Sequence, residues 1–424
     1  MSQAVAFPAR TSSREAPSHE ARLDRLAQVA VNVGLGLARG QEVVMTAPVD
    51  ALPLARRITE HAYKAGASLV TAFYSDEPSA LARFQYAPDE AFDTAPGWLF
   101  DGMAAAFRRG AARLAIAGEN PALLAGQDPD KVARANRARS TAYRPALELI
   151  TGFAVNWTIV SNASPSWARQ VFPDLPEDAA VARLWDAIFA ASRVDAPDPV
   201  TAWQDHNAAL ALRTQSLNGR RYAALGYRGP GTDLRVGLAN GHLWIGGAER
   251  ARNGILCNPN IPSEEVFTTP HARHVEGTVR STKPLSYQGT LIQDIEVRFE
   301  AGRIVAASAR TGQGVLERVL DTDDGARRLG EVALVPNSSP IAASGLLFYN
   351  TLFDENAASH IALGQAYKTC IEGGESLSDA ALAERGANTS LIHIDWMIGS
   401  GQVDVDGIGQ DGTAEPLMRA GEWV

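Results

Sequence analysis

The sequence predicts an α/β fold in which an N-terminal α/β domain with a mostly parallel sheet precedes a C-terminal α+β domain. Up to about Ser216, segments with apolar residues at helical spacing alternate with short apolar segments of strand length. Beyond Ser216, strand-like segments follow each other across glycine-containing turns, a pattern typical of antiparallel hairpins. We therefore expect a flexible tail over residues 1–20, an N-terminal domain over 21–215 and a C-terminal domain over 216–424.

The N-terminal half begins with two predicted pairs of helix and strand. Helical spacing of apolar residues predicts a helix over Leu23–Ala38, and the apolar segment Val43–Thr46 predicts a strand after it. Leu52–Ala65 repeats the helical pattern, Gly66 ends it, and Ser68–Tyr74 predicts the next strand. A strand, a helix and a strand in this order favour parallel pairing with a right-handed crossover.

The same alternation continues through the rest of the first half. We expect a helix over Ala104–Gly110 and strands over Arg113–Gly118 and Gly152–Val160. No segment here matches the glycine-rich fingerprint of a dinucleotide-binding or P-loop motif. This domain is therefore expected to lack nucleotide chemistry of its own.

The second half contains hairpin patterns. Tyr227–Leu238 combines a turn with strand-like alternation, and Tyr287–Ser308 predicts two strands joined around Ala301–Arg303. Antiparallel pairing in this half supports the placement of a domain boundary near residue 215, with a margin of roughly twenty residues.

A proline-bounded loop over Asn258–Pro270 carries two adjacent carboxylates, Glu264 and Glu265. Prolines restrict the backbone, so this loop holds its side chains in place better than most loops do. The pair could cap a short helix or turn, or it could bind a ligand, and local sequence favours neither interpretation.

Composition limits the possible partners. The chain has 424 residues, of which 46% are hydrophobic and 21% charged, which is typical of a globular protein large enough for two domains. Its net charge of −9 argues against nucleic acid or an anionic membrane as a main partner. Cys257 and Cys370 are too few for a disulfide framework, so we expect reduced thiols and a cytoplasmic protein. Neither a spanning apolar run nor a signal peptide is present.

A short apolar segment near the C-terminus carries two polar residues on one face. Leu391–Ile398 has strand length, and His393 and Asp395 are separated by one residue, so their side chains point to the same side. Burial of both groups without partners would be costly. A bound metal ion would satisfy them, and so would a hydrogen bond between the two.

The segment before this strand offers further metal-binding residue types. Asn350–Tyr367 begins with an acidic and amide cluster and continues with an alanine-rich stretch, for which we expect a helix from about Glu355. His360 and Tyr367 are seven residues apart, so they would lie on one helix face. They could face a common metal cavity, or they could pack against the domain core. Together with Glu331, these residues make the C-terminal domain the predicted metal-binding domain.

Four motifs in the same order resemble the thermophilic aminopeptidase (aminopeptidase T) family of metallopeptidases. They are Ile261–Thr268, Gly330–Val335, Leu352–His360 with Tyr367, and His393–Asp395. The resemblance implies an intracellular, homodimeric exopeptidase that acts on peptides with a free N-terminus at a dinuclear metal site. It maps the family's ligands onto Glu265, Glu331, His360, Tyr367, His393 and Asp395. Glu264 adjoins Glu265, and a shift of one residue would exchange the two.

The chemistry of these residues agrees with that assignment. Two divalent ions can activate a water molecule and polarise a peptide carbonyl, as hydrolysis at neutral pH requires. Carboxylates, imidazoles and a phenol suit Zn²⁺, Co²⁺, Mn²⁺ or Mg²⁺. We assign catalytic roles to Glu264, Glu265 and Tyr367, with one of the two glutamates as general base and the other as metal ligand.

Two other functions use the same residues. His360, His393 and Asp395 form the ligand set of a mononuclear non-haem iron(II) ring-cleaving dioxygenase. The carboxylates Glu265 and Glu331 favour the hydrolase, because they would recruit a second ion. A non-catalytic binding protein would have lost some ligands, and none is missing.

Several further residues have alternative interpretations. The pair His271 and His274 could bind metal but fits exposed surface histidines better, and Lys283 could stabilise an oxyanion or lie in a solvated turn. Asn350 could orient a metal ligand or cap a helix, whereas Trp396 fits core packing. We assign no role to the remaining histidines, which are His19, His61, His206 and His242.

Overall fold

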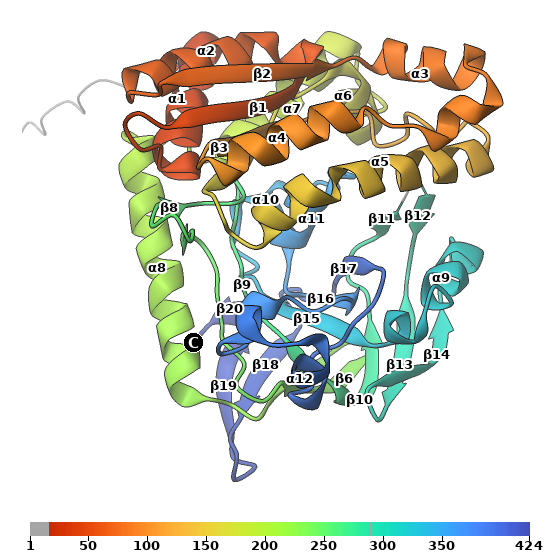
Figure 1. Ribbon diagram of the computed structural model, residues 1–424. Helices are drawn as coiled ribbons and strands as arrows, with labels where there is room; N and C mark the ends of the chain where they lie inside the picture. Colours follow the sequence, from red (N-terminus) through yellow and green to blue (C-terminus); the bar gives the residue numbers. More distant parts are fainter. Residues whose placement is uncertain (1–16, 288–289) are drawn as a thin grey trace, which may run out of the picture.

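The computed structural model describes residues 17–287 and 290–424, and it places a helix-rich α/β layer over a β-rich half (Figure 1). The predicted tail over residues 1–20 lies mostly outside the described residues. Its last two positions, His19 and Glu20, already belong to the first helix. A long helix, α8 (Pro199–Arg220), runs down the side of the molecule from the upper layer to the lower one.

The upper layer is built on a four-stranded parallel sheet of order β2-β1-β3-β4. Its strands are β1 (Glu42–Pro48), β2 (Leu69–Ser75), β3 (Ala112–Ala117) and β4 (Trp157–Ser161). The predicted parallel order of the first two strands is confirmed, because Glu42 pairs with Leu69 and Pro48 with Ser75 in parallel register. The α/β fold class is confirmed as well.

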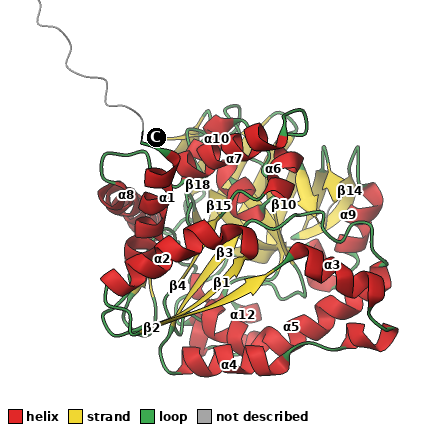
Figure 2. Cartoon of the chain, turned by 90° about the horizontal axis from the view of Figure 1, so that it is seen from above, coloured by secondary structure: helices red, strands yellow, loops and turns green. Residues whose placement is uncertain are grey.

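Helices cover both faces of this sheet (Figure 2). They are α1 (His19–Val29), α2 (Leu52–Lys64), α4 (Gly97–Arg108), α5 (Pro129–Thr151), α6 (Pro165–Val171) and α7 (Glu177–Ala191). Helix α3 (Glu77–Tyr86) follows β2 and buries none of its side chains. Leu26 of α1, Ile58 of α2 and Phe189 of α7 are fully buried in one core cluster. Phe107 of α4 and Ile150 of α5 belong to a second cluster that packs against Val44 of β1. Burial of these faces stabilises the layer.

The first helix differs from the prediction of one helix over Leu23–Ala38. The α-helical part ends at Val29, and a π-helical turn over Ala30–Leu35 follows it. Gly36 ends the segment with φ of +56°, a left-handed conformation in which an added Cβ would lie 2.0 Å from the carbonyl oxygen of Leu256. The apolar spacing predicts the buried face but not the change of helix type.

The lower half contains an eight-stranded antiparallel sheet of order β14-β13-β10-β6-β5-β18-β19-β20. Its strands are β5 (Ala224–Gly229), β6 (Thr232–Leu238), β10 (Pro270–Arg280), β13 (Glu296–Glu300), β14 (Arg303–Ser308), β18 (Asp404–Ile408), β19 (Ala414–Arg419) and β20 (Glu422–Trp423). Both predicted hairpins are confirmed, as β5 pairs with β6 and β13 with β14. Two smaller ladders join β7 (Glu249–Arg250) to β8 (Leu256–Cys257) and β11 (Leu285–Tyr287) to β12 (Thr290–Ile292).

A second antiparallel sheet, of order β17-β16-β15-β9, packs against the eight-stranded one. Its strands are β9 (Val266–Thr268), β15 (Leu329–Leu334), β16 (His360–Gly364) and β17 (His393–Met397). Two short helices of this half are α9 (Gln313–Leu320) and α12 (Asp379–Glu384). Helices α10 (Pro340–Ser344) and α11 (Thr351–Asp354) pack instead into the core of the upper layer, where Ile341 and Phe353 are buried. The predicted strand around His393 and Asp395 is confirmed.

The predicted helix from Glu355 through Tyr367 is wrong. Helix α11 ends at Asp354, a 3-10 turn covers Glu355–Ala357, and the next segment is strand β16. Every residue of β16 is buried, and the strand pairs on one side with β15 and on the other with β17. These pairings to distant segments override the helix propensity of the alanine-rich stretch.

Two further expectations concern the chain as a whole. The predicted boundary near residue 215 falls inside α8 and stays a prediction. Cys257 and Cys370 are buried and unpaired, as expected of reduced thiols. Within the described residues, no helix combines the length and the apolar character needed to span a membrane.

Candidate metal centre

The small sheet brings five of the predicted site residues to one place. His360 lies on β16, Glu331 on the neighbouring strand β15, and His393 and Asp395 on β17. Glu331 and Asp395 both stand opposite Ala362 of the central strand. Ala362 shares a face with His360, and its small side chain leaves room between the carboxylates. Glu265 joins them from the loop before β9, which pairs with the other edge of β15.

These side chains form two groups that share Glu331. The first consists of Glu265, Glu331 and His360, and the second of Glu331, His393 and Asp395. Within each group the ligand atoms all lie within 4.8 Å of one another. One oxygen of Glu331, Oε1, lies 3.4 Å from Nε2 of His360, and the other, Oε2, lies 3.7 Å from Nε2 of His393. A carboxylate whose two oxygens face different imidazoles is placed to bridge two ions.

Both imidazoles are oriented by the backbone. Nδ1 of His360 lies 3.1 Å from the carbonyl oxygen of Ala358, and Nδ1 of His393 lies 2.7 Å from that of Gln365. A carbonyl oxygen only accepts hydrogen bonds, so Nδ1 carries a proton in each ring. Both histidines therefore direct Nε2 toward the carboxylates, as metal-ligating histidines with outer-shell partners do.

The acidic surroundings shift the pKa values of these histidines. Burial alone would lower the pKa of His360, but the neighbouring carboxylates of Glu265 and Glu331 raise it well above the usual value. Burial also opposes protonation of His393, and the charge of Asp395 outweighs it, raising the pKa to about 9. Divalent ions would replace these protons as the positive charge between the carboxylates, so metal binding is expected to release protons.

The residues present fit a metal ion. Glu265 Oε2 and Asp395 Oδ1 are buried and accept no hydrogen bond within the described chain. Each nevertheless lies close to an imidazole nitrogen, at 3.2 Å from His360 Nε2 and 3.3 Å from His393 Nε2. Buried carboxylate oxygens without a donor are costly, and an ion between carboxylate and imidazole would satisfy both. Oxygen and imidazole donors suit the divalent ions expected from the sequence.

A cavity of about 190 Å³ opens onto the cluster, and Tyr367 and Glu355 line it beside the ligand groups. The Tyr367 ring lies 4.7 Å from the ring of His393, and this tyrosine keeps 42% of its surface exposed because it faces the cavity. Burial, reinforced by the charges of Glu265 and Asp395, raises the pKa of Glu355 well above its usual value. Sequence reasoning missed Glu355 as a site residue. Its place in the acidic cluster before His360 was the available signal.

Glu264 lies outside the metal cluster, although it adjoins Glu265. Its Oε1 lies 2.6 Å from Nη1 of Arg193, and its Oε2 accepts a hydrogen bond of 2.9 Å from Nη2 of the same residue. Arg193 also donates to Nδ1 of His206, which in turn donates through Nε2 to the carbonyl oxygen of Ser263. The backbone N–H of Glu264 donates to Oδ1 of Asn356, at 2.6 Å. Both the carboxylate and the backbone N–H of Glu264 therefore have fixed partners. The bond to Asn356 also connects the Glu265 loop to the turn that carries Glu355.

Replacing Glu264 by Gln is expected to lower the free energy of unfolding by about 3–5 kcal/mol. The change would leave the largely buried guanidinium of Arg193 without its opposite charge. Urea denaturation followed by circular dichroism measures the effect. The matched control is Glu60→Gln, since Glu60 pairs with Lys64 in full contact with solvent and such pairs add little stability. Equal stability of the two variants would show that Glu264 and Arg193 do not form a buried ion pair.

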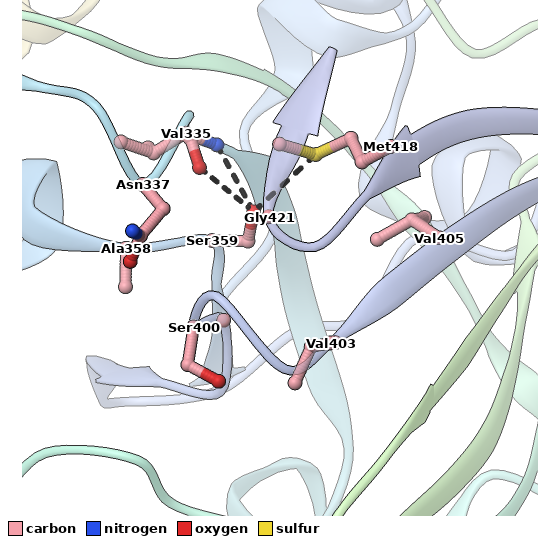
Figure 3. A pocket seen from close by; sticks show the side chains of 10 residues that line it. Val335, Asn337, Ala358, Ser359, Ser400, Val403, Val405, Met418 and Gly421 are labelled. Carbon is pink, nitrogen blue, oxygen red and sulfur yellow. Dashed lines mark hydrogen bonds between the residues drawn. The ribbon is translucent and has the colours of Figure 1, made fainter. Parts of the chain in front are cut away.

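Ser359 anchors the start of strand β16, immediately before His360 (Figure 3). Its Oγ accepts a hydrogen bond of 3.1 Å from the N–H of Val335 and donates one of 3.2 Å to the carbonyl oxygen of the same residue. The hydroxyl also lies 3.8 Å from the sulfur of Met418 across a small cavity. Because both backbone groups of Val335 depend on one hydroxyl, Ser359 holds β16 against the end of β15 and so helps to position His360.

The structure also places the other residues considered in the sequence. His271 and His274 lie on β10 with their rings stacked 3.7 Å apart, outside both ligand groups, and His271 is buried instead of exposed. Asn350 caps α11 by accepting a hydrogen bond from the N–H of Leu352, and Trp396 is a core residue. Lys283 acts electrostatically on the buried carboxyl group of Asp354. His206, to which no role was assigned, belongs to the network around Glu264.

Residues 19–423 match the thermophilic metalloprotease (M29) family. The chain belongs to the M29 family. It is 57% identical over 402 residues to aminopeptidase T of Thermus thermophilus, covering 95% of this chain and 98% of that protein. It is 46% identical over 405 residues to aminopeptidase 2 of Geobacillus stearothermophilus, covering 96% and 98%. The solved structure of wild-type AmpT from Thermus thermophilus superimposes with a TM-score of 0.91 at 56% identity, covering 96% of this chain and all of that one.

Membership of the M29 family confirms the resemblance found in the sequence and decides the class of enzyme. The chain is a metal-dependent aminopeptidase, a hydrolase of the exopeptidase type. The family gives no support to the ring-cleaving dioxygenase considered as the alternative. An enzyme of this family requires divalent metal, and the two ligand groups that share Glu331 are its candidate site.

Proposed function

We propose that this M29 enzyme hydrolyses the N-terminal peptide bond of peptides with a free N-terminus, at a site that holds two divalent ions. The observation that carries the proposal is the position of Glu331, whose two oxygens face two different histidines. Each histidine has a second carboxylate beside it, Glu265 for His360 and Asp395 for His393. Two complete half-sites with one shared ligand favour a dinuclear centre over a mononuclear one.

In this proposal Glu265, Glu331 and His360 hold one ion, and Glu331, His393 and Asp395 hold the other. Tyr367 faces the same cavity and is the sixth proposed ligand. Zn²⁺, Co²⁺, Mn²⁺ and Mg²⁺ all suit these donors. When bound, the pair of ions supplies a water of lowered pKa and polarises the substrate carbonyl.

The remaining chemistry belongs to the protein's own side chains. We place the general base on Glu355, because it lines the cavity but is in neither ligand group. Glu264, one of the two glutamates considered from the sequence as general base, pairs with Arg193 and serves to position the Glu265 loop. Tyr367 contributes its phenol oxygen as the sixth proposed ligand. Burial raises the pKa of this phenol well above its usual value in the protein alone, so binding of an ion to it would displace a proton.

Three expectations about the enzyme's setting remain part of the proposal. The homodimer rests on the family resemblance, and light scattering of the purified protein tests it. The cytoplasmic location rests on the two unpaired cysteines. The absence of nucleic-acid partners rests on the net charge of −9.

Metal analysis and chelation test the proposed function. Elemental analysis of the purified protein is expected to give close to two non-iron divalent ions per chain. Chelation is expected to abolish release of nitroaniline from leucine p-nitroanilide and to lower Tm, because ions that bind only the folded state stabilise it. Both should recover on addition of Zn²⁺, Co²⁺, Mn²⁺ or Mg²⁺. One ion per chain in a fully active enzyme would contradict the dinuclear centre.

A further inference from the structure

The cavity that opens onto the metal cluster extends to a wall on which apolar side chains surround one carboxyl group. The apolar members are Phe153, Trp157, Ile245, Pro259 and Phe267, and the acidic one is Glu249. The rings of Phe153 and Trp157 lie 5.8 Å apart. Phe153 follows α5 and Trp157 begins β4, whereas the other members come from the segment around β7 and β8 and from β9, so the wall is assembled from both halves of the chain.

The carboxyl group of Glu249 is half-buried on this wall. It accepts one hydrogen bond, from the backbone N–H of Gly246, and no described side chain pairs with it. Burial raises its pKa to about 7. The nearest cation in sequence, Arg250, is exposed and donates to the carbonyl oxygen of Gly254. An acid in such surroundings is neutralised by a proton or by a cation that enters the cavity.

The segment that carries Glu249 lies directly beside the metal-binding loop. Ile245 pairs with Phe267 of β9, and a Cβ added to Gly246 would lie only 2.4 Å from the carbonyl oxygen of Glu265. Two residues, Gly247 and Ala248, separate Gly246 from Glu249, so the Cα atoms of Gly246 and Glu249 are at most about 11 Å apart. Glu249 and the proposed ligands Glu265 and Asp395 line the same cavity, so the side chain of a substrate bound at the metal cluster can extend toward Glu249.

Aromatic rings around a single carboxyl group suit an ammonium or guanidinium group on an aliphatic stem. The stem packs against the rings and the charged end meets the carboxylate. The substrate's α-ammonium has other partners, because it must lie next to the bond that is cleaved. There Glu265, Glu331, Glu355 and Asp395 already supply negative charge.

We propose that Glu249 binds the charged side chain of an N-terminal lysine or arginine, and that this cavity makes the enzyme prefer peptides that begin with a basic residue. The inference rests on the proposed aminopeptidase function and adds its substrate class. The cationic end of the side chain would replace the proton that burial otherwise favours on Glu249.

Lysine and norleucine p-nitroanilides test the proposal, because the two side chains differ only by the terminal ammonium. The wild-type holoenzyme is expected to have at least a tenfold higher kcat/KM for the lysine substrate. Glu249→Gln should reduce this ratio at least tenfold, mainly through KM. Glu384→Gln, at an exposed glutamate of α12, is the matched control and should keep the wild-type ratio.

A ratio that Glu249→Gln does not change would overturn the proposal. An equal loss for both substrates would overturn it too, because it would place the shared α-ammonium at Glu249. Calorimetric binding of free lysine and free norleucine gives a readout that does not depend on turnover. If no substrate is cleaved but lysine still binds at least tenfold more tightly in a Glu249-dependent manner, the proposed function fails and the binding site stands.

Discussion

Replacing Glu331 by Gln is expected to reduce kcat/KM for leucine p-nitroanilide by about a thousandfold or more. Each metal ion contributes several kcal/mol to stabilisation of the transition state, and about 1.4 kcal/mol corresponds to a factor of ten in rate. Among the residues that the structure describes, Glu331 is the carboxylate that belongs to both ligand groups. An amide in its place has no charge and only one acceptor atom, so it cannot hold both ions.

The metal content of the same variant distinguishes loss of an ion from loss of fold. Elemental analysis should show fewer than two ions per chain, while circular dichroism stays close to that of the wild type. Glu331→Asp keeps the charge on a shorter side chain and should retain more metal than Glu331→Gln. Two ions per chain together with activity within a few-fold of the wild type would contradict the bridging role.

The metal-binding strand is the part of the site that could be predicted best from sequence. His393 and Asp395 alternate with apolar residues, and alternation on a strand fixes which side chains share a face. The structure confirms that strand. The parallel β1-β2 pair and the two hairpins could be predicted for the same reason, since local patterns and turn residues specify them.

What could not be predicted depends on contacts between distant segments. His360 was expected on a helix, but the strand that carries it is held by β15 and β17 on either side. The roles of Glu264 and Glu265 could not be separated, because the difference comes from Arg193, a residue 71 positions away. No pattern around Glu264 signals that partner.

Glu249 could not be predicted from the sequence for a related reason. Its local sequence contains no motif, and its significance comes from the aromatic wall supplied by Phe153 and Trp157 of the other half of the chain. A buried, unpaired carboxyl group can be recognised only when the cavity around it is known. Prediction of residues on such a wall therefore requires knowledge of the fold, whereas metal ligands on one strand can be predicted from the sequence.

Replacing Glu355 by Gln is expected to lower kcat by about a hundredfold to ten-thousandfold, the usual contribution of a general base, while both ions stay bound. Burial and the charges of Glu265 and Asp395 hold the pKa of Glu355 well above its usual value. Cations bound beside it would lower that pKa again, bringing it toward the working pH. Glutamine has the same shape but cannot accept a proton. Elemental analysis and steady-state kinetics measure the two effects separately.

Asp354, the neighbour of Glu355, provides the matched control for this prediction. Its two carboxylate oxygens accept hydrogen bonds from the backbone N–H groups of Phe348 and Asn350, at 2.8 and 3.0 Å. Asp354→Asn should therefore lower Tm, because one of these N–H groups loses its acceptor, and leave kcat of the folded enzyme close to that of the wild type. Loss of an ion from Glu355→Gln would instead make Glu355 a metal ligand. In that case Asp354 would bind backbone N–H groups and its neighbour Glu355 would bind metal. The general base would then be another carboxylate that lines the cavity.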